Sequence, residues 1–270
     1  MLVTTERGKA AHVTDDTILT TSSEGCLIIT LARPDRMNAW NTAMRAKLVE
    51  TLEAASKDPT VTSIVLTGAG ERAFCAGQDL NEASDFDEDF AEIWIDDFAR
   101  LYRAVRSLEV PVVSAINGVA AGSAFQFVLL TDIRIGHSGV RMGQPEINSG
   151  IASITGPWIM REVLGLSRTI ELTLTGRMME ADEALRIGVL HEIVAQDRVL
   201  DRATEVARDL GAKPQTAMKL IKRRFFEVLE PGLDDAIAAA KVYHRMAIAS
   251  GEMHASTQAF LDARGGRKRD

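Results

Sequence analysis

Apolar and polar positions follow two different periods along the first 195 residues, and together they predict both strands and helices. Residues 17–31 alternate between apolar and polar on either side of Glu24-Gly25, a pattern typical of a β-hairpin. Residues 42–56 instead place apolar side chains at helical spacing. By the same criteria, buried strands are expected at 61–67, 111–116 and 132–136, and a helix at 122–130. Strands that alternate with helices indicate an α/β fold.

The C-terminal part of the chain has a purely helical pattern. After Pro145 the sequence predicts a loop and two helices, with Pro157 in the first turn of one and Ser167 as the N-cap of the next. From residue 197 onward the apolar positions keep helical spacing. We therefore divide the chain into an aperiodic N-terminal extension at 1–14, an α/β core at 15–196 and a helical C-terminal region at 197–270.

The composition excludes several classes of protein. Of the 270 residues, 46% are hydrophobic and 26% are charged, as in a globular chain. The net charge of −7 argues against nucleic-acid binding, which needs a basic surface. The two cysteines fit a reducing compartment, and no Cys or His spacing indicates a metal site. The first residues have mixed charge and no apolar segment, so no signal peptide is expected. These features predict a cytoplasmic protein.

One uncharged stretch, 110–131, is long enough to span a bilayer. Polar residues and glycines interrupt its middle, however, among them Asn117, Gly118, Gly122 and Gln126. This break is typical of a buried strand, a turn and a buried helix. We therefore expect no membrane association.

Three local patterns point to chemistry, and each also has a purely structural interpretation. Gly68, Gly70 and Ala73 match a dinucleotide-binding fingerprint, but the helix that the fingerprint requires does not follow, so the match is weak. The backbone N–H groups at the start of the helix expected at 122 either stabilise an oxyanion or simply belong to a tightly packed turn. Glu146, which follows a proline between apolar segments, is either a general base with a raised pKa or a salt-bridge partner.

Five segments occur together in this chain: RPDRMNAW (33–40), AFCAGQDL (73–80), INGVAAGSAFQFVLLTDIRI (116–135), MGQPEINSGI (142–151) and LTGRMMEADEALRIGVLHEIV (174–194). In sequence and order they resemble the crotonase superfamily, also called the enoyl-CoA hydratase/isomerase family. The resemblance implies a crotonase-like spiral of ββα units with a C-terminal helical region that trimerises and covers the active site. It also implies an acyl-CoA substrate that carries coenzyme A, no permanently bound cofactor, no metal, and a homotrimer or a dimer of trimers.

The resemblance also assigns candidate site residues. The backbone N–H groups of Gln78 and Ser123 correspond to the family's oxyanion hole, and Glu146 corresponds to its catalytic carboxylate. Contacts with coenzyme A are implied for Arg33, Arg36, Asn38, Ala73, Ala76 and Leu80. Phosphate contacts are implied for the basic C-terminal residues Arg264, Arg267 and Lys268. Candidates for the acyl pocket are the aromatic residues Phe86, Phe90, Trp94 and Trp158.

Two positions depart from the family's pattern. Family hydratases use two glutamates, and the first of them falls on Gln126, whose amide can orient water or substrate but cannot exchange a proton at neutral pH. Ser123 stands where the family usually has glycine. A single carboxylate at Glu146 best matches enoyl-CoA double-bond isomerisation, which is the expected reaction. The alternatives are an enoyl-CoA hydratase in which Gln126 positions water, an acyl-CoA thioester hydrolase, and a non-catalytic acyl-CoA-binding protein.

Overall fold

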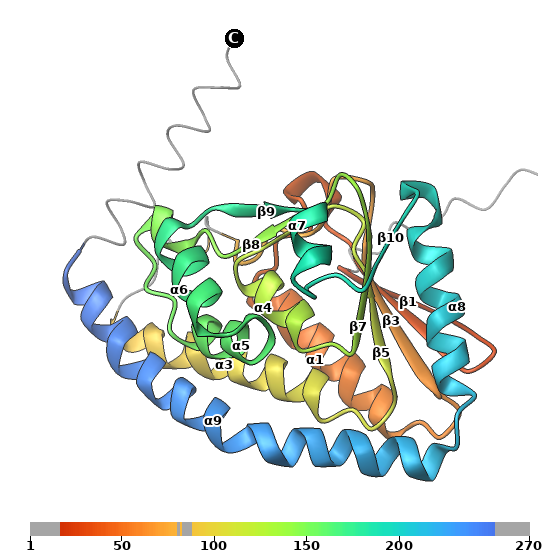
Figure 1. The fold of residues 1–270 in the computed structure, drawn as a ribbon. Helices are drawn as coiled ribbons and strands as arrows, with labels where there is room; N and C mark the ends of the chain where they lie inside the picture. Colours follow the sequence, from red (N-terminus) through yellow and green to blue (C-terminus); the bar gives the residue numbers. More distant parts are fainter. Residues whose placement is uncertain (1–16, 80–81, 83–87, 252–270) are drawn as a thin grey trace, which may run out of the picture.

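Two β-sheets form the centre of the computed structural model, which describes residues 17–79, 82 and 88–251 (Figure 1). The six-stranded sheet has the order β1 (Ile18–Ser23), β2 (Cys26–Leu31), β3 (Ser63–Gly68), β5 (Val112–Ala115), β7 (Ile133–His137) and β10 (Glu192–Val194). The four-stranded sheet has the order β4 (Ala73–Cys75), β6 (Val119–Ala121), β8 (Arg141–Gly143) and β9 (Met178–Glu180). β1 pairs antiparallel with β2 and β8 with β9, whereas the other pairs within the two sheets are parallel.

Three consecutive pairs of strands in the described part of the chain contribute one strand to each sheet. β3 is followed by β4, β5 by β6 and β7 by β8, and the second strand always joins the four-stranded sheet. A helix follows each pair, namely α3 (Glu88–Arg106), α4 (Ser123–Leu129) and α5 (Thr155–Leu164). The α/β class is therefore confirmed, and the core repeats a ββα unit three times.

The predicted hairpin and the first helix are confirmed. β1 and β2 pair across a turn in which Glu24 and Gly25 have positive φ angles of 54° and 76°. The helix expected at 42–56 is α1 (Thr42–Lys57). The Asn41 side chain caps it by accepting a backbone N–H of the first turn at 3.0 Å.

The rest of the helices are α6 (Leu166–Thr175), α7 (Ala181–Arg186), α8 (Val199–Gly211) and α9 (Gln215–Ala249), with short 3-10 helices η1 (Pro34–Arg36), η2 (Glu146–Ser149) and η3 (Gln196–Arg198). The prediction of Ser167 as an N-cap is wrong, because α6 begins one residue earlier and Gly165 occupies the cap position with a φ of 76°. The uncharged stretch 110–131 folds as β5 and α4, as expected, with a further short strand, β6, between them that the sequence pattern did not predict. In the described part of the chain, no helix combines the length and apolarity that a bilayer crossing requires.

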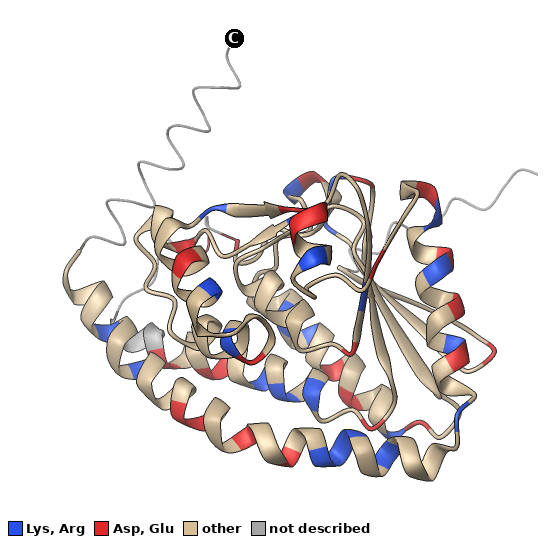
Figure 2. Ribbon diagram, viewed as in Figure 1, with Lys and Arg blue, Asp and Glu red and all other residues tan. Residues whose placement is uncertain are grey.

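Helices cover both faces of the six-stranded sheet. α8 packs on one face, where Ala203 and Ala207 belong to a small cluster with Val65, Val113 and Ile135 of the strands. α1 lies on the opposite face with the main core, α3 packs on α1, and α9 runs along α3 (Figure 1). Figure 2 shows that charged residues lie mostly on the helices and the loops, whereas the strands carry few.

Candidate active site

Three segments that are distant in sequence meet at one edge of the four-stranded sheet. β4, β6 and β8 are neighbouring parallel strands, so their carboxyl ends lie at the same edge. Gln78 follows β4, Ser123 follows β6, and Glu146 follows β8. The carboxyl ends of parallel strands are where α/β proteins commonly bind ligands. The topology therefore brings together the three residues expected to do the chemistry.

Two glycines allow the close approach of these segments. A Cβ atom placed on Gly77 would lie 3.5 Å from the Ser123 nitrogen, and one placed on Gly122 would lie 3.0 Å from Glu146 Oε1. Both glycines have positive φ angles, 88° and 60°, which are costly for other residues. Within the described residues, the backbone N–H groups of Gln78 and Ser123 donate to no acceptor. Two unpaired donors beside a carboxylate are the arrangement that stabilises an oxyanion.

Trp40 connects the two segments that carry the backbone N–H groups of Gln78 and Ser123. Its backbone forms a parallel bridge with Gln78, in which Trp40 N donates to Gly77 O at 3.0 Å and Asp79 N donates to Trp40 O at 3.1 Å. Its indole Nε1 donates to Ser123 Oγ at 3.0 Å. Because Trp40 is fully buried, it fixes both donors relative to the core. It also accounts for the serine that replaces the family's usual glycine, since the hydroxyl oxygen accepts the indole N–H.

Arg45 on α1 holds the Gln78 side chain in place. Its guanidinium donates to Gln78 Oε1 at 2.6 Å, and it lies 3.7 Å from carboxylate oxygens of both Glu82 and Asp97. The ring of Phe98 packs on it at 4.7 Å. The Arg45 side chain is only 2% exposed, and burial lowers its pKa while the two acids oppose that shift. Arg45 is therefore a buried group that keeps the segment around Gln78 in position.

Glu146 has the electrostatics of a general base. Its Oε1 accepts a hydrogen bond from Gln126 Nε2 at 3.1 Å, and its buried Oε2 has no hydrogen-bond partner among the described residues. Burial raises the pKa of Glu146 to about 7, and the hydrogen bond from Gln126 opposes that shift. A carboxylate that titrates near neutrality, with one free oxygen, is suited to accepting and returning a proton.

Gln126 is held at both ends of its amide. Tyr102 donates its hydroxyl to Gln126 Oε1 at 2.6 Å. Gln126 Nε2 donates to Glu146 Oε1 and, at 3.4 Å, to Ser153 Oγ. Gln126 is 5% exposed, so these protein groups form its surroundings. The structure thus places Gln126 beside Glu146, as expected, but with its hydrogen-bonding groups directed to the protein.

Several of the residues expected to bind coenzyme A have structural partners within the chain. Arg33 forms an ion pair with Asp79 at 3.0 Å. Asn38 is fully buried and donates to the carbonyl oxygens of Ala69 and Ala73 at 3.0 and 2.8 Å. Arg36 is exposed. Ala73 lies in β4, and Ala76 lies between β4 and Gln78. Leu80, Arg264, Arg267 and Lys268 lie outside the described residues.

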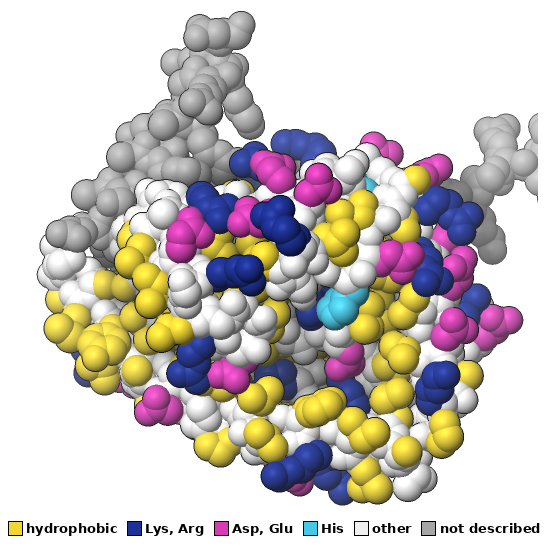
Figure 3. Space-filling model, in the orientation of Figure 1, with side chains coloured by type: hydrophobic (Ala, Val, Ile, Leu, Met, Phe, Trp, Pro, Cys, Tyr) yellow, Lys and Arg dark blue, Asp and Glu magenta, His cyan; other side chains and the backbone are white. Residues whose placement is uncertain are grey.

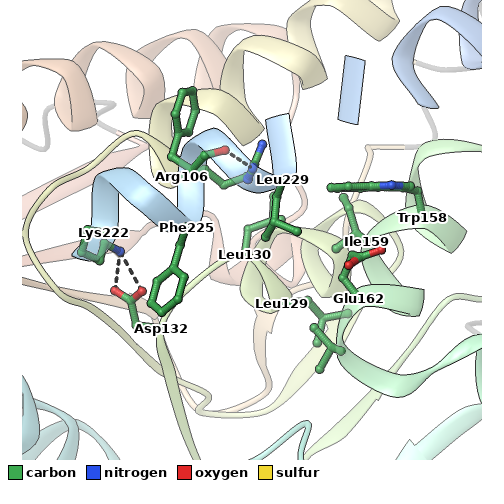
Figure 4. Close-up of a pocket in the computed structure, with 12 residues that line it drawn as sticks. Arg106, Leu129, Leu130, Asp132, Trp158, Ile159, Glu162, Lys222, Phe225 and Leu229 are labelled. Atoms are coloured by element: carbon green, nitrogen blue, oxygen red, sulfur yellow. Dashed lines mark hydrogen bonds and ion pairs between the residues drawn. The ribbon is translucent and has the colours of Figure 1, made fainter. Parts of the chain in front are cut away.

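Trp94 and Trp158 lie in different places. Trp94 on α3 donates its indole N–H to Gln78 Oε1 at 3.3 Å. Trp158 on α5 lines a separate pocket of about 220 Å³ against α9, and Figure 4 shows it there with Phe225 and Leu229. Phe86 lies outside the described residues, and so does the Phe90 side chain. Among the described residues, no three His, Cys, Asp or Glu side chains are grouped as a metal site requires.

Sequence analysis missed three residues of this site, namely Trp40, Arg45 and Tyr102. Trp40 stands in a recognisable motif, but its link to Ser123 spans 83 positions. Arg45 and Tyr102 lie in segments with helical periodicity. The polar group at the end of a buried side chain does not change that periodicity, so the sequence pattern does not identify either residue. Only the tertiary packing of α1 and α3 brings them to the strand ends.

Comparison with known proteins defines the class. Residues 21–267 match the sequence model of the family described as Enoyl-CoA hydratase/isomerase. The chain therefore belongs to this family, and it is an enzyme of the hydratase or isomerase kind that acts on acyl-CoA. It is 32% identical over 256 residues to the 1,2-epoxyphenylacetyl-CoA isomerase of Escherichia coli (strain K12), covering 92% of this chain and 96% of the relative.

Two further comparisons agree with that assignment. The short-chain-enoyl-CoA hydratase of Clostridium acetobutylicum is 28% identical over 238 residues, which cover 88% of this chain and 91% of the relative. The crystal structure of an enoyl-CoA hydratase/isomerase from Mycobacterium paratuberculosis matches with a TM-score of 0.84 at 25% identity, over 92% of this chain and 100% of that one. The crotonase fold that the motifs predicted is thereby confirmed.

Proposed function

We propose that this protein is an enoyl-CoA double-bond isomerase in which Glu146 is the single catalytic base. The backbone N–H groups of Gln78 and Ser123 bind the thioester oxygen of a 3-enoyl-CoA. Glu146 Oε2 takes a proton from C2, and the electron pair moves to the thioester oxygen to form a dienolate. The protonated Glu146 then gives the proton to C4, which leaves a 2-enoyl-CoA with the same atoms and charge.

The hydrogen bonding of Gln126 carries this proposal. A hydratase of this family needs a second group that holds the attacking water and moves its proton. Both N–H groups of Gln126 are directed to Glu146 and Ser153, and its oxygen accepts from Tyr102. Gln126 therefore has no free donor for a water molecule, and an amide cannot take up the water's proton. A reaction that needs only one proton-transfer group fits this arrangement better.

The electrostatics of the site support the same reaction. Because the pKa of Glu146 is about 7, its ionised and protonated forms coexist at neutral pH, as a group that both takes and returns a proton requires. The enolate oxygen gains two fixed backbone donors. Removing one such donor typically costs about 10²–10³ in rate.

We also propose a path for the coenzyme A part of the substrate. It lies along residues 33–38 and the segment that follows β4, where Arg36 is exposed for a phosphate. The Arg33–Asp79 ion pair and the buried Asn38 amide keep these two segments in place. Local basic groups suffice for an anionic ligand in spite of the net negative charge.

The assembly proposed for this enzyme is a homotrimer or a dimer of trimers. α6 exposes a row of apolar residues at helical spacing, Leu166, Ile170 and Leu174, with exposed fractions of 61%, 49% and 66%. Figure 3 shows hydrophobic side chains on this side of the molecule, over α6 and along α9. Exposed apolar rows of this kind are typical of surfaces that are buried by another protein.

The reaction is tested with 3-enoyl-, 2-enoyl- and saturated acyl-CoA esters, whose products are separated by liquid chromatography against both isomers as standards and weighed by mass spectrometry. Interconversion of 3-enoyl and 2-enoyl esters without a change in mass is the expected result. Addition of one water to the 2-enoyl ester would identify a hydratase, and release of free coenzyme A a hydrolase. Binding without any conversion would indicate an acyl-CoA-binding protein. Each of these three results would overturn the isomerase assignment.

A further inference from the structure

Tyr102 on α3 lies behind the catalytic carboxylate, although no motif includes it. Its side chain is almost fully buried and packs on Phe98 with ring centroids 5.8 Å apart. Its hydroxyl donates to Gln126 Oε1 at 2.6 Å, and Gln126 Nε2 donates to Glu146 Oε1 at 3.1 Å. Tyr102, Gln126 and Glu146 therefore form a continuous chain of hydrogen bonds from α3 to η2.

The tyrosine and the carboxylate together select which end of the amide faces Glu146. An amide group has an acceptor on one side and two donors on the other, whereas an ionised carboxylate only accepts. The carboxylate therefore favours the amide nitrogen, and the Tyr102 hydroxyl stabilises this orientation by donating to the Gln126 oxygen. If the amide were reversed, its oxygen would face an ionised carboxylate, and two acceptors would oppose each other. The hydroxyl thus keeps Gln126 in the orientation that stabilises ionised Glu146.

We propose that Tyr102 is a positioning residue for proton transfer. It fixes the Gln126 amide, which in turn holds Glu146 Oε1 and leaves Oε2 to exchange the proton with the substrate. The consequence for catalysis rests on the proposed role of Glu146 as the base. The consequence for the ionisation of Glu146 does not depend on which reaction the enzyme performs.

Few charged groups lie near this chain. Arg45 interacts electrostatically with Tyr102, as does Glu146 itself. Burial and the charge of Glu146 raise the pKa of Tyr102 well above its usual value, so the hydroxyl remains a donor throughout the working pH range. Within the described residues, the groups that affect the pKa of Glu146 are its own backbone and Gln126. Loss of the Tyr102 hydroxyl therefore acts on Glu146 through Gln126.

The direct test is the ionisation of Glu146 in the Tyr102→Phe variant. Infrared difference spectroscopy isolates the C=O stretch of protonated Glu146 as the band that is absent from Glu146→Gln. In the wild type this band should titrate with a midpoint of about 7. In Tyr102→Phe the midpoint should rise by about one pH unit, since a hydrogen bond to a charged group is weakened. Tyr243→Phe removes an exposed hydroxyl and is the matched control, with the wild-type midpoint expected.

A kinetic test separates positioning from packing. For Tyr102→Phe, kcat/KM should fall roughly five- to tenfold near pH 7 and recover toward the wild-type value about two pH units higher, where Glu146 is ionised again. A mere packing defect would lower activity equally at every pH. In a Gln126→Leu background, adding Tyr102→Phe should shift the Glu146 midpoint no further.

An unchanged midpoint in Tyr102→Phe, or a full additional shift in the Gln126→Leu background, would overturn the proposal. Failure of the proposed function is a separate result, because it appears as turnover that survives Glu146→Gln. The infrared titration distinguishes the two cases, since it needs no turnover.

Discussion

Glu146 combines a buried, unpaired carboxylate oxygen with a pKa of about 7, and this combination carries a cost in stability. An acid whose native pKa is raised above its ordinary value of 4.5 favours the protonated native state. The free energy of unfolding should therefore fall as the pH rises from about 4.5 to about 7. In the proposed mechanism, the same desolvation makes this carboxylate a base that works near neutrality.

Replacement of Glu146 by Gln should stabilise the fold, but only at high pH. At pH 8 we expect the free energy of unfolding to rise by about 2–3 kcal/mol, since the neutral amide avoids the buried charge. At pH 4.5 the glutamate is protonated in the native state and only half ionised in the unfolded state, so little gain is expected there. Urea unfolding at both pH values and one protein concentration measures the difference. Glu50→Gln, at an exposed position of α1, should show no gain, and an equal gain for Glu146→Gln at both pH values would refute the explanation.

At the scale of elements, the site depends on three short strands that end side by side. β4, β6 and β8 have three residues each, yet their parallel pairing brings positions 78, 123 and 146 together. The Gly122 backbone lies beside Glu146, with a φ of 60° and a ψ of −131° that only glycine adopts readily. A side chain there would meet the Glu146 carboxylate directly.

Gly122→Ala should abolish most of the activity. Its Cβ would lie 3.0 Å from Glu146 Oε1, so the carboxylate must move, and we expect kcat to fall at least about tenfold. The matched control is Gly165→Ala, which has a φ of 76° but no atom within 4 Å of the added Cβ. Both variants should lose about 1 kcal/mol or more of stability through backbone strain, measured by thermal unfolding. Equal activity in the two variants would show that contact with Glu146 is unimportant.

The sequence was informative about long elements and about motif residues, for different reasons. The hairpin, α1 and β3 have enough residues to display a period, and all three are confirmed. Strands of three residues such as β4 and β6 display none, so their position in a second sheet became visible only in the structure. The same holds for the partners of Gln126. Tyr102 is close to it only through the tertiary packing of α3 in the main core, which no local pattern records.

At the scale of the whole molecule, apolar side chains on the outer face of α6 are exposed. The apolar row on α6, formed by Leu166, Ile170 and Leu174, faces away from the core of the single chain. Around the pocket in Figure 4, Lys222 is paired with Asp132 at 2.6 Å, so its charge is already balanced within the chain. Neither feature lies at the edge of the four-stranded sheet where Gln78, Ser123 and Glu146 meet. The α6 row is suited to assembly.

Ile170→Asp should disrupt the assembly. The wild type is expected to have three or six times the chain mass of 29.4 kDa by light scattering, whereas the variant should shift toward the monomer because a charge cannot be buried cheaply at the interface. Leu200→Asp on α8 is the control, since Leu200 is 40% exposed and lies outside the row. A wild-type mass equal to one chain would contradict the proposed oligomer.

The most direct test of the central claim is deuterium transfer in heavy water. Wild-type enzyme, Glu146→Gln and the exposed control Glu50→Gln are incubated with a 3-enoyl-CoA, and deuterium at C2 and C4 is followed by mass spectrometry. We expect double-bond migration in the wild type and in Glu50→Gln, with deuterium at C4 in those turnovers in which the proton on Glu146 exchanges with solvent before it returns. Neither is expected in Glu146→Gln. Exchange at the wild-type rate in Glu146→Gln would show that another group moves the proton and would contradict the account.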